Sequence, residues 1–396
     1  MTLPILSDNA TSVSRSSNGC TVSARASARA APIDMVRGLA IISIIGADQL
    51  SWAMRGMFED ESRVAQFSRA LAAQFEHATW EGLRFYDLVL PVLIFLAGVS
   101  AVFSLAKARE NHNRLQLYSR VLRRAAVLYI LGIVYYGGLT ATWPDIRLLG
   151  VLQRIAACYL IAATLFLALP LRTLYVIVGV VLLGYWLAFE LISLDEVQAG
   201  TFLPEINLAH AIDRKYLPGK LWYGTWDPEG LTSTLPAICT CLLGVFAGLL
   251  LTEHNLRAIH KASWLVFIGS AALAAGTVWS FRFPVIKALW TSSYVLITAG
   301  YSCLFLALAY LLADVWRLGG FLNVFLWVGA NAITLYLLEG LIGFAKIAET
   351  ILGHDLLTRL DGTSPGLSAA LSPAIGLAIA VCLARYLYAK RVFLRM

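Results

Sequence analysis

Residues 75–100, FEHATWEGLRFYDLVLPVLIFLAGVS, join a polar stretch containing one histidine to a long apolar run. An apolar run of about 20 residues is long enough to cross a bilayer as a helix. Because His77 stands just before this run, we expect its imidazole to lie at a membrane face. Similar apolar runs recur along the chain, which is typical of a protein that crosses a membrane many times.

The composition excludes a soluble enzyme of this length. Of the 396 residues, 59% are hydrophobic and only 14% are charged, whereas soluble domains carry about 25% charged residues. We therefore predict an all-α, polytopic membrane protein with about ten transmembrane helices. Their expected ranges are 38–53, 86–106, 121–140, 148–169, 173–192, 232–251, 262–281, 289–313, 321–344 and 367–388.

Positive charge gathers at one set of helix ends. Six Lys and Arg residues lie within 107–124, and three more close the chain, whereas most acids lie in segments 54–84 and 193–230. Since cytoplasmic loops are enriched in Lys and Arg, we expect both termini to be cytoplasmic and the two acidic segments to lie on the opposite side. The net charge of +7 then reflects membrane topology and does not indicate nucleic-acid binding.

The N-terminal residues differ in composition from the rest. Residues 1–31 are rich in Ser, Ala, Thr and Arg and lack the apolar centre of a secretory signal. We expect a disordered cytoplasmic arm there, with an organellar transit peptide as the alternative, followed by one transmembrane domain at 32–396. The six cysteines show neither metal-ligand spacing nor a disulfide framework, so we expect no metal. Gly244 and Gly248 form a GxxxG pattern that predicts close helix packing.

Two groups of charged residues mark the cytoplasmic ends of the predicted helices. Asp34 and Arg37 stand three positions apart and can share a helix face as an ion pair. A cationic group after the second predicted helix can hold the phosphates of a nucleotide or simply follow from the topology. That group consists of Arg120, Arg123 and Arg124.

Further polar residues are expected at the opposite face. Asp48 lies roughly 21 Å beyond Asp34 along a helix with a rise of about 1.5 Å per residue, on the side where His77 emerges. Ionisable groups in a membrane cost about 2.5–3.5 kcal/mol each, so such residues are functional candidates. The alternative is ion pairing that only packs helices, for example between Arg154 and Asp48 or Glu339. The remaining members of this polar layer are Asp87, Gln153 and, nearer the middle of the bilayer, Asn331.

The stretch WDPEGL at 226–231 predicts the start of a helix. Asp227 suits the N-cap and Pro228 the first helical position. Glu229 has no role in such a cap and is therefore the more suggestive of function. Trp222, Tyr223 and Trp226 nearby can either stack on a sugar ring or anchor the chain at the interface, where aromatic residues gather.

Several separated motifs, in the same order, resemble the heparan-α-glucosaminide N-acetyltransferase family of membrane enzymes. They cover the chain from about residue 32 to its end. The motifs are IDMVRGL, HATWEGLRFYDLVLPVLIFLAGVS, RLLGVLQRIAACYL, WDPEGL, LWTSSYV and NAITLYLLEG.

The resemblance implies transfer of an acetyl group from cytoplasmic acetyl-CoA to a sugar amine across the bilayer. It implies that His77 is the active histidine and that relatives form homodimers. Asp48 stands where the animal enzyme has Asn, and Glu339 stands where that enzyme has a second His, so a two-histidine mechanism does not carry over. The chain resembles the shorter bacterial form, some members of which are described as N-acetylglucosamine-related transporters.

The leading hypothesis is therefore an acetyl-CoA-dependent N- or O-acetyltransferase of the bacterial inner membrane, acting on an amino sugar or glycan. In it, His77, held by Asp48, takes the acetyl group or deprotonates the acceptor. Acetyl-CoA is held by Asp34, Arg37, Arg120, Arg123 and Arg124. The acceptor pocket is formed by Asp87, Gln153, Arg154, Asp227, Glu229, Asn331 and Glu339.

Two alternatives belong to other classes of protein. The first is a secondary transporter for an amino sugar such as N-acetylglucosamine, in which the buried carboxylates relay protons. The second is a non-catalytic scaffold in a glycan-assembly complex. Sugar uptake without acetyl-CoA would indicate the transporter, and failure to bind acetyl-CoA would favour the scaffold.

Overall fold

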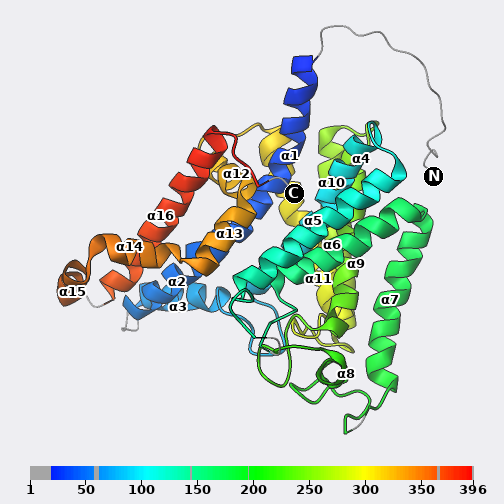
Figure 1. Cartoon of the computed structure of the whole chain (residues 1–396), viewed down its shortest axis with the longest axis horizontal. Coiled ribbons are helices and arrows are strands. Elements are labelled where there is room, and N and C mark those ends of the chain that lie inside the picture. Colours follow the sequence, from blue (N-terminus) through cyan, green and yellow to red (C-terminus); the bar gives the residue numbers. More distant parts are fainter. Residues whose placement is uncertain (1–18, 58–61, 143–144, 195, 364–365, 395–396) are drawn as a thin grey trace.

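The chain folds as a bundle of helices (Figure 1). The computed structural model describes residues 19–57, 62–142, 145–194, 196–363 and 366–394, and within these ranges there are isolated β-bridges but no β-strand. The predicted all-α, polytopic class is confirmed. The first half contains α1 (Gly19–Ile42), the π-helix η1 (Ser43–Ala47), α2 (Asp48–Met57), α3 (Arg63–Gln74), the short 3-10 helix η2 (Phe85–Leu88), α4 (Val89–Arg109), α5 (Arg114–Tyr135), α6 (Val151–Ala168) and α7 (Leu171–Leu191).

The second half continues with helices of similar length and ends in shorter ones. These are α8 (Leu208–Tyr216), α9 (Leu231–Thr252), α10 (Ala258–Ser280), α11 (Ser292–Tyr310), η3 (Leu311–Val315), η4 (Gly320–Leu322), α12 (Asn323–Ala330), α13 (Ala332–Leu341), α14 (Phe344–Leu352), α15 (His354–Thr363) and α16 (Leu367–Ala389).

Seven helices in the described part of the chain are long and apolar enough to cross a membrane. They are η2 with α4, α6, α7, α9, α10, α11 with η3, and α16. An eighth segment is also long and apolar enough when its two halves are taken together. The first half is η4 with α12, the second is α13, and the two are bent by 70° at Asn331. The expected number of ten spans and the cytoplasmic placement of both termini stay predictions.

Two of the ten predicted spans differ from these helices for visible reasons. The range 38–53 is divided among α1, η1 and α2. The range 121–140 corresponds to α5, whose first half carries Arg120, Arg123 and Arg124. Residues 19–31 of the expected arm are helical and continuous with α1, whereas residues 1–18 lie outside the described residues.

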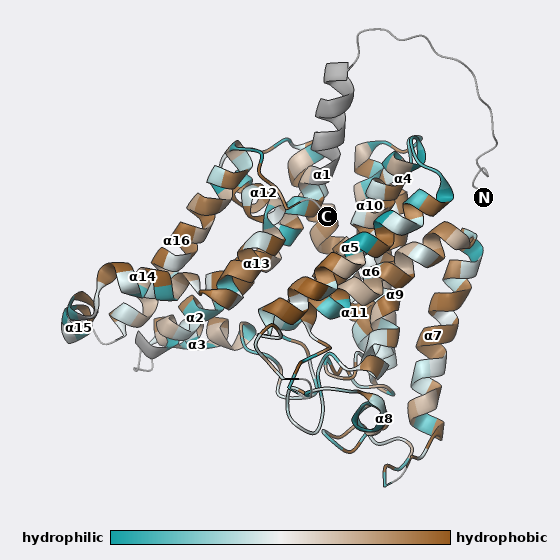
Figure 2. Ribbon diagram, viewed as in Figure 1, coloured by the Kyte–Doolittle hydropathy of each residue, from teal (hydrophilic) through white to brown (hydrophobic). Residues whose placement is uncertain are grey.

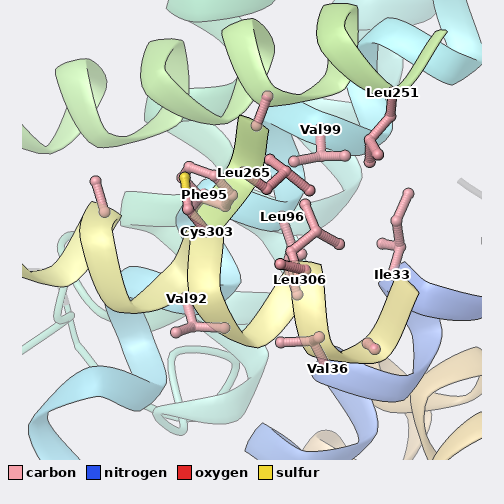
Figure 3. Packing of buried hydrophobic residues seen from close by; sticks show 14 of the residues in the cluster. Ile33, Val36, Val92, Phe95, Leu96, Val99, Leu251, Leu265, Cys303 and Leu306 are labelled. Carbon is pink, nitrogen blue, oxygen red and sulfur yellow. The ribbon is translucent and has the colours of Figure 1, made fainter. Parts of the chain in front are cut away.

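Helix α4 lies at the centre of the bundle. Its side chains Val92, Phe95, Leu96 and Val99 are buried against α1, α9, α10 and α11 (Figure 3). The partners labelled in that view are Ile33, Val36, Leu251, Leu265, Cys303 and Leu306. Helix α7, at the edge, instead leaves Val176, Val180 and Leu183 more than half exposed, and Figure 2 shows the same helix coloured largely apolar. An exposed apolar face of this kind suits contact with lipid.

Small residues let α9 approach α4 closely. A Cβ atom on Gly98 would lie 1.9 Å from the carbonyl oxygen of Cys241, and one on Gly244 would lie 2.0 Å from that of Phe95. A Cβ on Gly248 would lie 3.1 Å from the carbonyl oxygen of Val99. The close packing predicted from GxxxG is therefore confirmed.

The loops that carry the candidate site gather at one end of the bundle. Figure 1 shows α8 and the long connections there, with the start of α1 at the opposite end. Hydrogen bonds join these loops to one another: Gly82 N–H donates to the Val285 carbonyl at 2.8 Å, and the Trp80 indole donates to the Phe202 carbonyl at 2.8 Å. Segments far apart in the sequence thereby form one surface.

Candidate active site

His77 is anchored through one ring nitrogen to a buried carboxylate. It lies in the loop between α3 and η2, and its Nδ1 is 2.8 Å from Oδ1 of Asp87. The Asp87 side chain is 1% exposed, whereas that of His77 is 56% exposed. The Oδ2 atom of Asp87 also accepts the backbone N–H groups of Ala78 and Arg84, each at 3.1 Å. One carboxylate therefore fixes both the imidazole and the loop that carries it.

Lys287 adds a cation to this pair. It comes from the loop between α10 and α11, and its Nζ lies 3.2 Å from Oδ1 of Asp87. The same atom lies 2.9 Å from Nδ1 and 3.4 Å from Nε2 of His77. Burial lowers the pKa of Lys287, and the charge of Asp87 opposes that shift. The three side chains form a compact group, called here the His77–Asp87–Lys287 cluster.

The cluster fixes the roles of the two imidazole nitrogens. A neutral imidazole holds one proton, and a nitrogen that donates it to a carboxylate cannot also accept from an ammonium group. With Nδ1–H donated to Asp87, Lys287 donates to the carboxylate and lies within 3.4 Å of Nε2. The lone pair then belongs to Nε2, which can act as a base or nucleophile.

Asp48 reaches His77 only through a tyrosine. The Tyr86 hydroxyl donates to Oδ2 of Asp48 at 3.2 Å, and the Tyr86 ring lies 4.9 Å from the His77 ring, tilted by 32°. The expected direct contact between Asp48 and His77 is thus replaced by one from Asp87, because the loop turns back onto η2. A catalytic role of Asp48 stays a prediction.

Asp227 and Glu229 both pair with Arg147. The Nε and Nη2 atoms of Arg147 donate to the two carboxylate oxygens of Asp227 at 3.0 and 2.8 Å, and Nη2 also donates to Glu229 at 2.6 Å. Its guanidinium lies against the rings of Tyr136 and Trp222, 4.5 and 4.4 Å from their centroids. All three charged groups are buried, and Arg147 is the shared ion-pair partner of both acids. Their role toward an acceptor stays a prediction.

The predicted N-cap at Asp227 is wrong. Helix α9 begins at Leu231, after Gly230. The Asp227 carboxylate instead accepts the N–H groups of Glu229 at 2.9 Å and Trp222 at 3.0 Å. Two contacts hold Asp227 in the turn before the helix. Its carboxylate pairs with Arg147, and its backbone carbonyl accepts the N–H of Gly230.

Arg154 is fully buried, and part of its guanidinium is unpartnered. Nη2 donates to the Gly230 carbonyl at 3.1 Å and to the Ser233 hydroxyl, and the group lies 4.9 Å from the Trp290 ring. Its Nε and Nη1 find no hydrogen-bond partner among the described residues. The alternative of ion pairs with Asp48 or Glu339 is therefore not seen in that part of the chain. Gln153 donates to the Arg147 carbonyl at 3.4 Å.

Glu339 and Asn331 lie in different surroundings. Oε2 of Glu339 accepts Phe344 N–H at 3.0 Å, near Asp48. Asn331 occupies the break between α12 and α13, where its amide donates to the Trp327 carbonyl at 3.1 Å. Glu339 thus belongs to the polar layer near His77, whereas Asn331 faces a separate cavity.

That cavity lies inside the bundle among α1, α4, α5, α6, α12 and α13. It measures about 200 Å³ and is lined by mostly apolar side chains together with Arg37, Arg124 and Asn331. Arg37 donates to Asp34 at 2.9 Å and to the Ser100 hydroxyl at 3.0 Å. Of the predicted cationic residues, Arg37 and Arg124 line the cavity, whereas Arg120 and Arg123 are exposed on α5 and do not.

A row of tyrosines connects the cavity to the outer polar layer. Tyr336 lines the cavity and stacks on Tyr135 with ring centroids 4.7 Å apart. Tyr135 contacts Tyr136, which in turn covers Arg147. The cavity and the His77 layer are thus neighbours separated by aromatic side chains.

Two residues of this layer were not predicted. Lys287 and Arg147 both stand in loops, where Lys and Arg are common. The signal that could have found Lys287 is its position just before the motif LWTSSYV, on the side where acids predominate. Arg147 lies just ahead of the VLQR motif, in a connection whose course the sequence left undefined.

His210 makes the stability of these loops depend on pH. It is 1% exposed, its Nδ1 accepts Glu205 N–H at 3.2 Å, and its ring stacks on Trp226 at 4.6 Å. Burial, with a smaller effect of Arg214, lowers the pKa of His210 from 6.5 to about 3.

Because the unfolded chain protonates His210 first, stability is full above about pH 6.5 and falls as the pH drops toward 3. We expect a loss of about 1.4 kcal/mol per pH unit in that window. Thermal unfolding in detergent at several pH values measures it, with His210→Gln as the comparison. An equally steep acid loss in that variant would contradict this assignment.

The fold and the site define a polytopic all-α membrane protein with a histidine–carboxylate centre at one end of its helices. The chain is similar to the heparan-alpha-glucosaminide N-acetyltransferases of Homo sapiens and Mus musculus, at 27% and 25% identity over 319 residues. These matches cover 66% of this chain and 48% of each relative, so the chain spans about half the length of the curated relatives it matches. No family model matches the chain. The resemblance seen in the motifs is confirmed as a similarity of this chain to these two N-acetyltransferases.

Proposed function

We propose that this protein is a transmembrane acetyltransferase that moves an acetyl group from cytoplasmic acetyl-CoA to an amino sugar or glycan on the periplasmic side of a bacterial inner membrane. The proposal rests on the way in which the His77 imidazole is held. Its Nδ1 is held by buried Asp87, while most of its side chain is open to the outside. The N-acetyltransferase relatives support the same class of reaction.

The lone pair on Nε2 serves either route of transfer. In direct transfer, the acceptor nitrogen bonds to the thioester carbonyl carbon, the C–S bond breaks, and Nε2 receives the amine proton and passes it to the departing sulfur. In the two-step route, Nε2 first bonds to the acetyl carbon as the C–S bond breaks and a thiolate leaves. The acceptor nitrogen then bonds to that carbon as the Nε2–C bond breaks, and the amine proton passes through Nε2 to the thiolate. In both, Asp87 stabilises the positive charge that develops on the ring.

The donor is proposed to enter from the side of Arg37 and Arg124. A cavity of about 200 Å³ is smaller than typical pockets of about 300–1,000 Å³ that enclose a whole ligand. It would therefore receive only the thioester arm. The nucleotide would stay at the mouth, where exposed Arg120 and Arg123 can meet its phosphates. The exposed ring of Trp222 and the unpartnered donors of Arg154 are the candidates for acceptor contacts.

The test is incubation of purified protein with acetyl-CoA and a panel of amino sugars, followed by mass spectrometry of the sugars and the protein. We expect His77→Ala to reduce the acetylated sugar by about 10²–10⁴-fold, since a positioned base contributes that much. His112→Ala, which changes an exposed histidine after α4, is the control and should keep full activity.

Two results would overturn the proposal. One is undiminished acetyl transfer by His77→Ala. The other is uptake of labelled sugar by proteoliposomes that contain the protein but no acetyl-CoA, which would indicate the transporter.

A further inference from the structure

The backbone around Lys287 is fixed by contacts of its loop with neighbouring segments. The loop 281–291 pairs with the His77 loop through the bridge between Glu81 and Ile286 and through the bond from Gly82 to Val285. Directly after Lys287, Leu289 and Trp290 are fully buried. Trp290 N–H donates to the Lys287 carbonyl at 3.1 Å. The backbone on both sides of the lysine is thus fixed against the segment that carries the histidine.

The ammonium group and the imidazole share one close counter-charge, the Asp87 carboxylate. Nζ lies 2.9 and 3.4 Å from the two ring nitrogens, and both groups contact the same Oδ1 of Asp87. If the ring took a second proton, two cations would lie in contact and one carboxylate would have to balance both. Like charges within about 4–6 Å disfavour the charged form.

The other acids near this pair have hydrogen-bond or ion-pair partners of their own. Glu76 is paired with Arg84 at 2.8 Å and with Arg55 at 3.0 Å, and Glu229 is paired with Arg147. Asp48 is held by the Tyr86 hydroxyl, and Arg154 adds a further positive charge. The Tyr294 hydroxyl donates to the Asp87 carbonyl at 2.7 Å.

We propose that Lys287 is a positioning residue whose charge, held against the His77 ring, opposes addition of a second proton to the imidazole and favours the tautomer with its lone pair on Nε2. This inference rests on the proposed function, in which that lone pair reacts. Lys287 stays an ammonium group throughout and exchanges no proton with the substrates. By repelling the imidazolium, it favours the return of the proton from Nε2 to the leaving sulfur.

The test reads the protonation of His77 without any acetyl donor. Diethyl pyrocarbonate carbethoxylates only unprotonated imidazole nitrogen, so the labelling rate of His77, resolved by mass spectrometry across pH, reports its protonation. In Lys287→Met, we expect the midpoint of this profile to rise by about one pH unit relative to the unmodified protein. Lys287→Arg should restore the original midpoint, and Lys220→Met, at an exposed lysine in another loop, should leave it unchanged.

Further outcomes separate this inference from the proposed reaction. The inference would be overturned if the midpoint were unchanged in both Lys287→Met and Lys287→Gln. A labelling rate at high pH equal to that of the unmodified protein would show that these variants are folded. A shifted midpoint in a protein that transfers no acetyl group would support the role of Lys287 while defeating the acetyltransferase. If transfer is found, the acid limb of kcat/KM should move with the labelling midpoint.

Discussion

Replacing Asp87 by Asn is expected to reduce acetyl transfer by about 10²–10⁴-fold, close to the loss in His77→Ala. An amide is neutral and cannot balance the positive charge that forms on the imidazole. It would also leave Lys287 and the Ala78 and Arg84 N–H groups with a weaker acceptor in a position that is 1% exposed. The acetylated sugar is measured by mass spectrometry under saturating acetyl-CoA.

Asp48→Asn is the matched control, because Asp48 contacts Tyr86 and not His77. We expect a smaller loss, as an amide oxygen can still accept from the Tyr86 hydroxyl. If Asp48→Asn were as damaging as Asp87→Asn, the carboxylate that serves His77 would have to be reassigned. Such a result would favour the direct pairing first expected from the sequence.

Replacing Arg147 by Met is expected to lower the free energy of unfolding by about 3–5 kcal/mol, because it leaves buried carboxylates without their partner. Asp227 and Glu229 are 1% and 8% exposed, and each accepts a hydrogen bond from Arg147. Tyr136 and Trp222 would also lose their contact with the guanidinium. Thermal unfolding in detergent, followed by tryptophan fluorescence, measures the loss.

Two comparisons make this result specific. Arg55→Met removes the ion pair between Arg55 and Glu76, whose side chains are 46% and 26% exposed, respectively. We expect this change to lower the free energy of unfolding by only about 0–1 kcal/mol. Combining Arg147→Met with Asp227→Asn and Glu229→Gln removes the uncompensated charge and should recover much of the stability. Equal losses in Arg147→Met and Arg55→Met would show that the buried ion cluster contributes little.

The transmembrane segments could be predicted because the bilayer imposes one simple requirement, a run of about 20 apolar residues. The helices depart from the predicted spans in two places. Helix α5 carries Arg120, Arg123 and Arg124 in its first half, and a π-helix divides the predicted span 38–53. The N-cap at Asp227 failed because its carboxylate pairs with Arg147, eighty positions earlier.

The sequence by itself determined the class of protein, the helical segments and the presence of His77 beside a polar layer. Those features follow from composition and from local runs of residues. Only the tertiary structure showed that Asp87 is the carboxylate that holds the imidazole, that Lys287 contacts both, and that Arg147 pairs with Asp227 and Glu229. These contacts form between loops that helix packing brings together. The path of a loop depends on backbone hydrogen bonds to segments that are distant in the sequence. A local pattern of residues does not predict these hydrogen bonds.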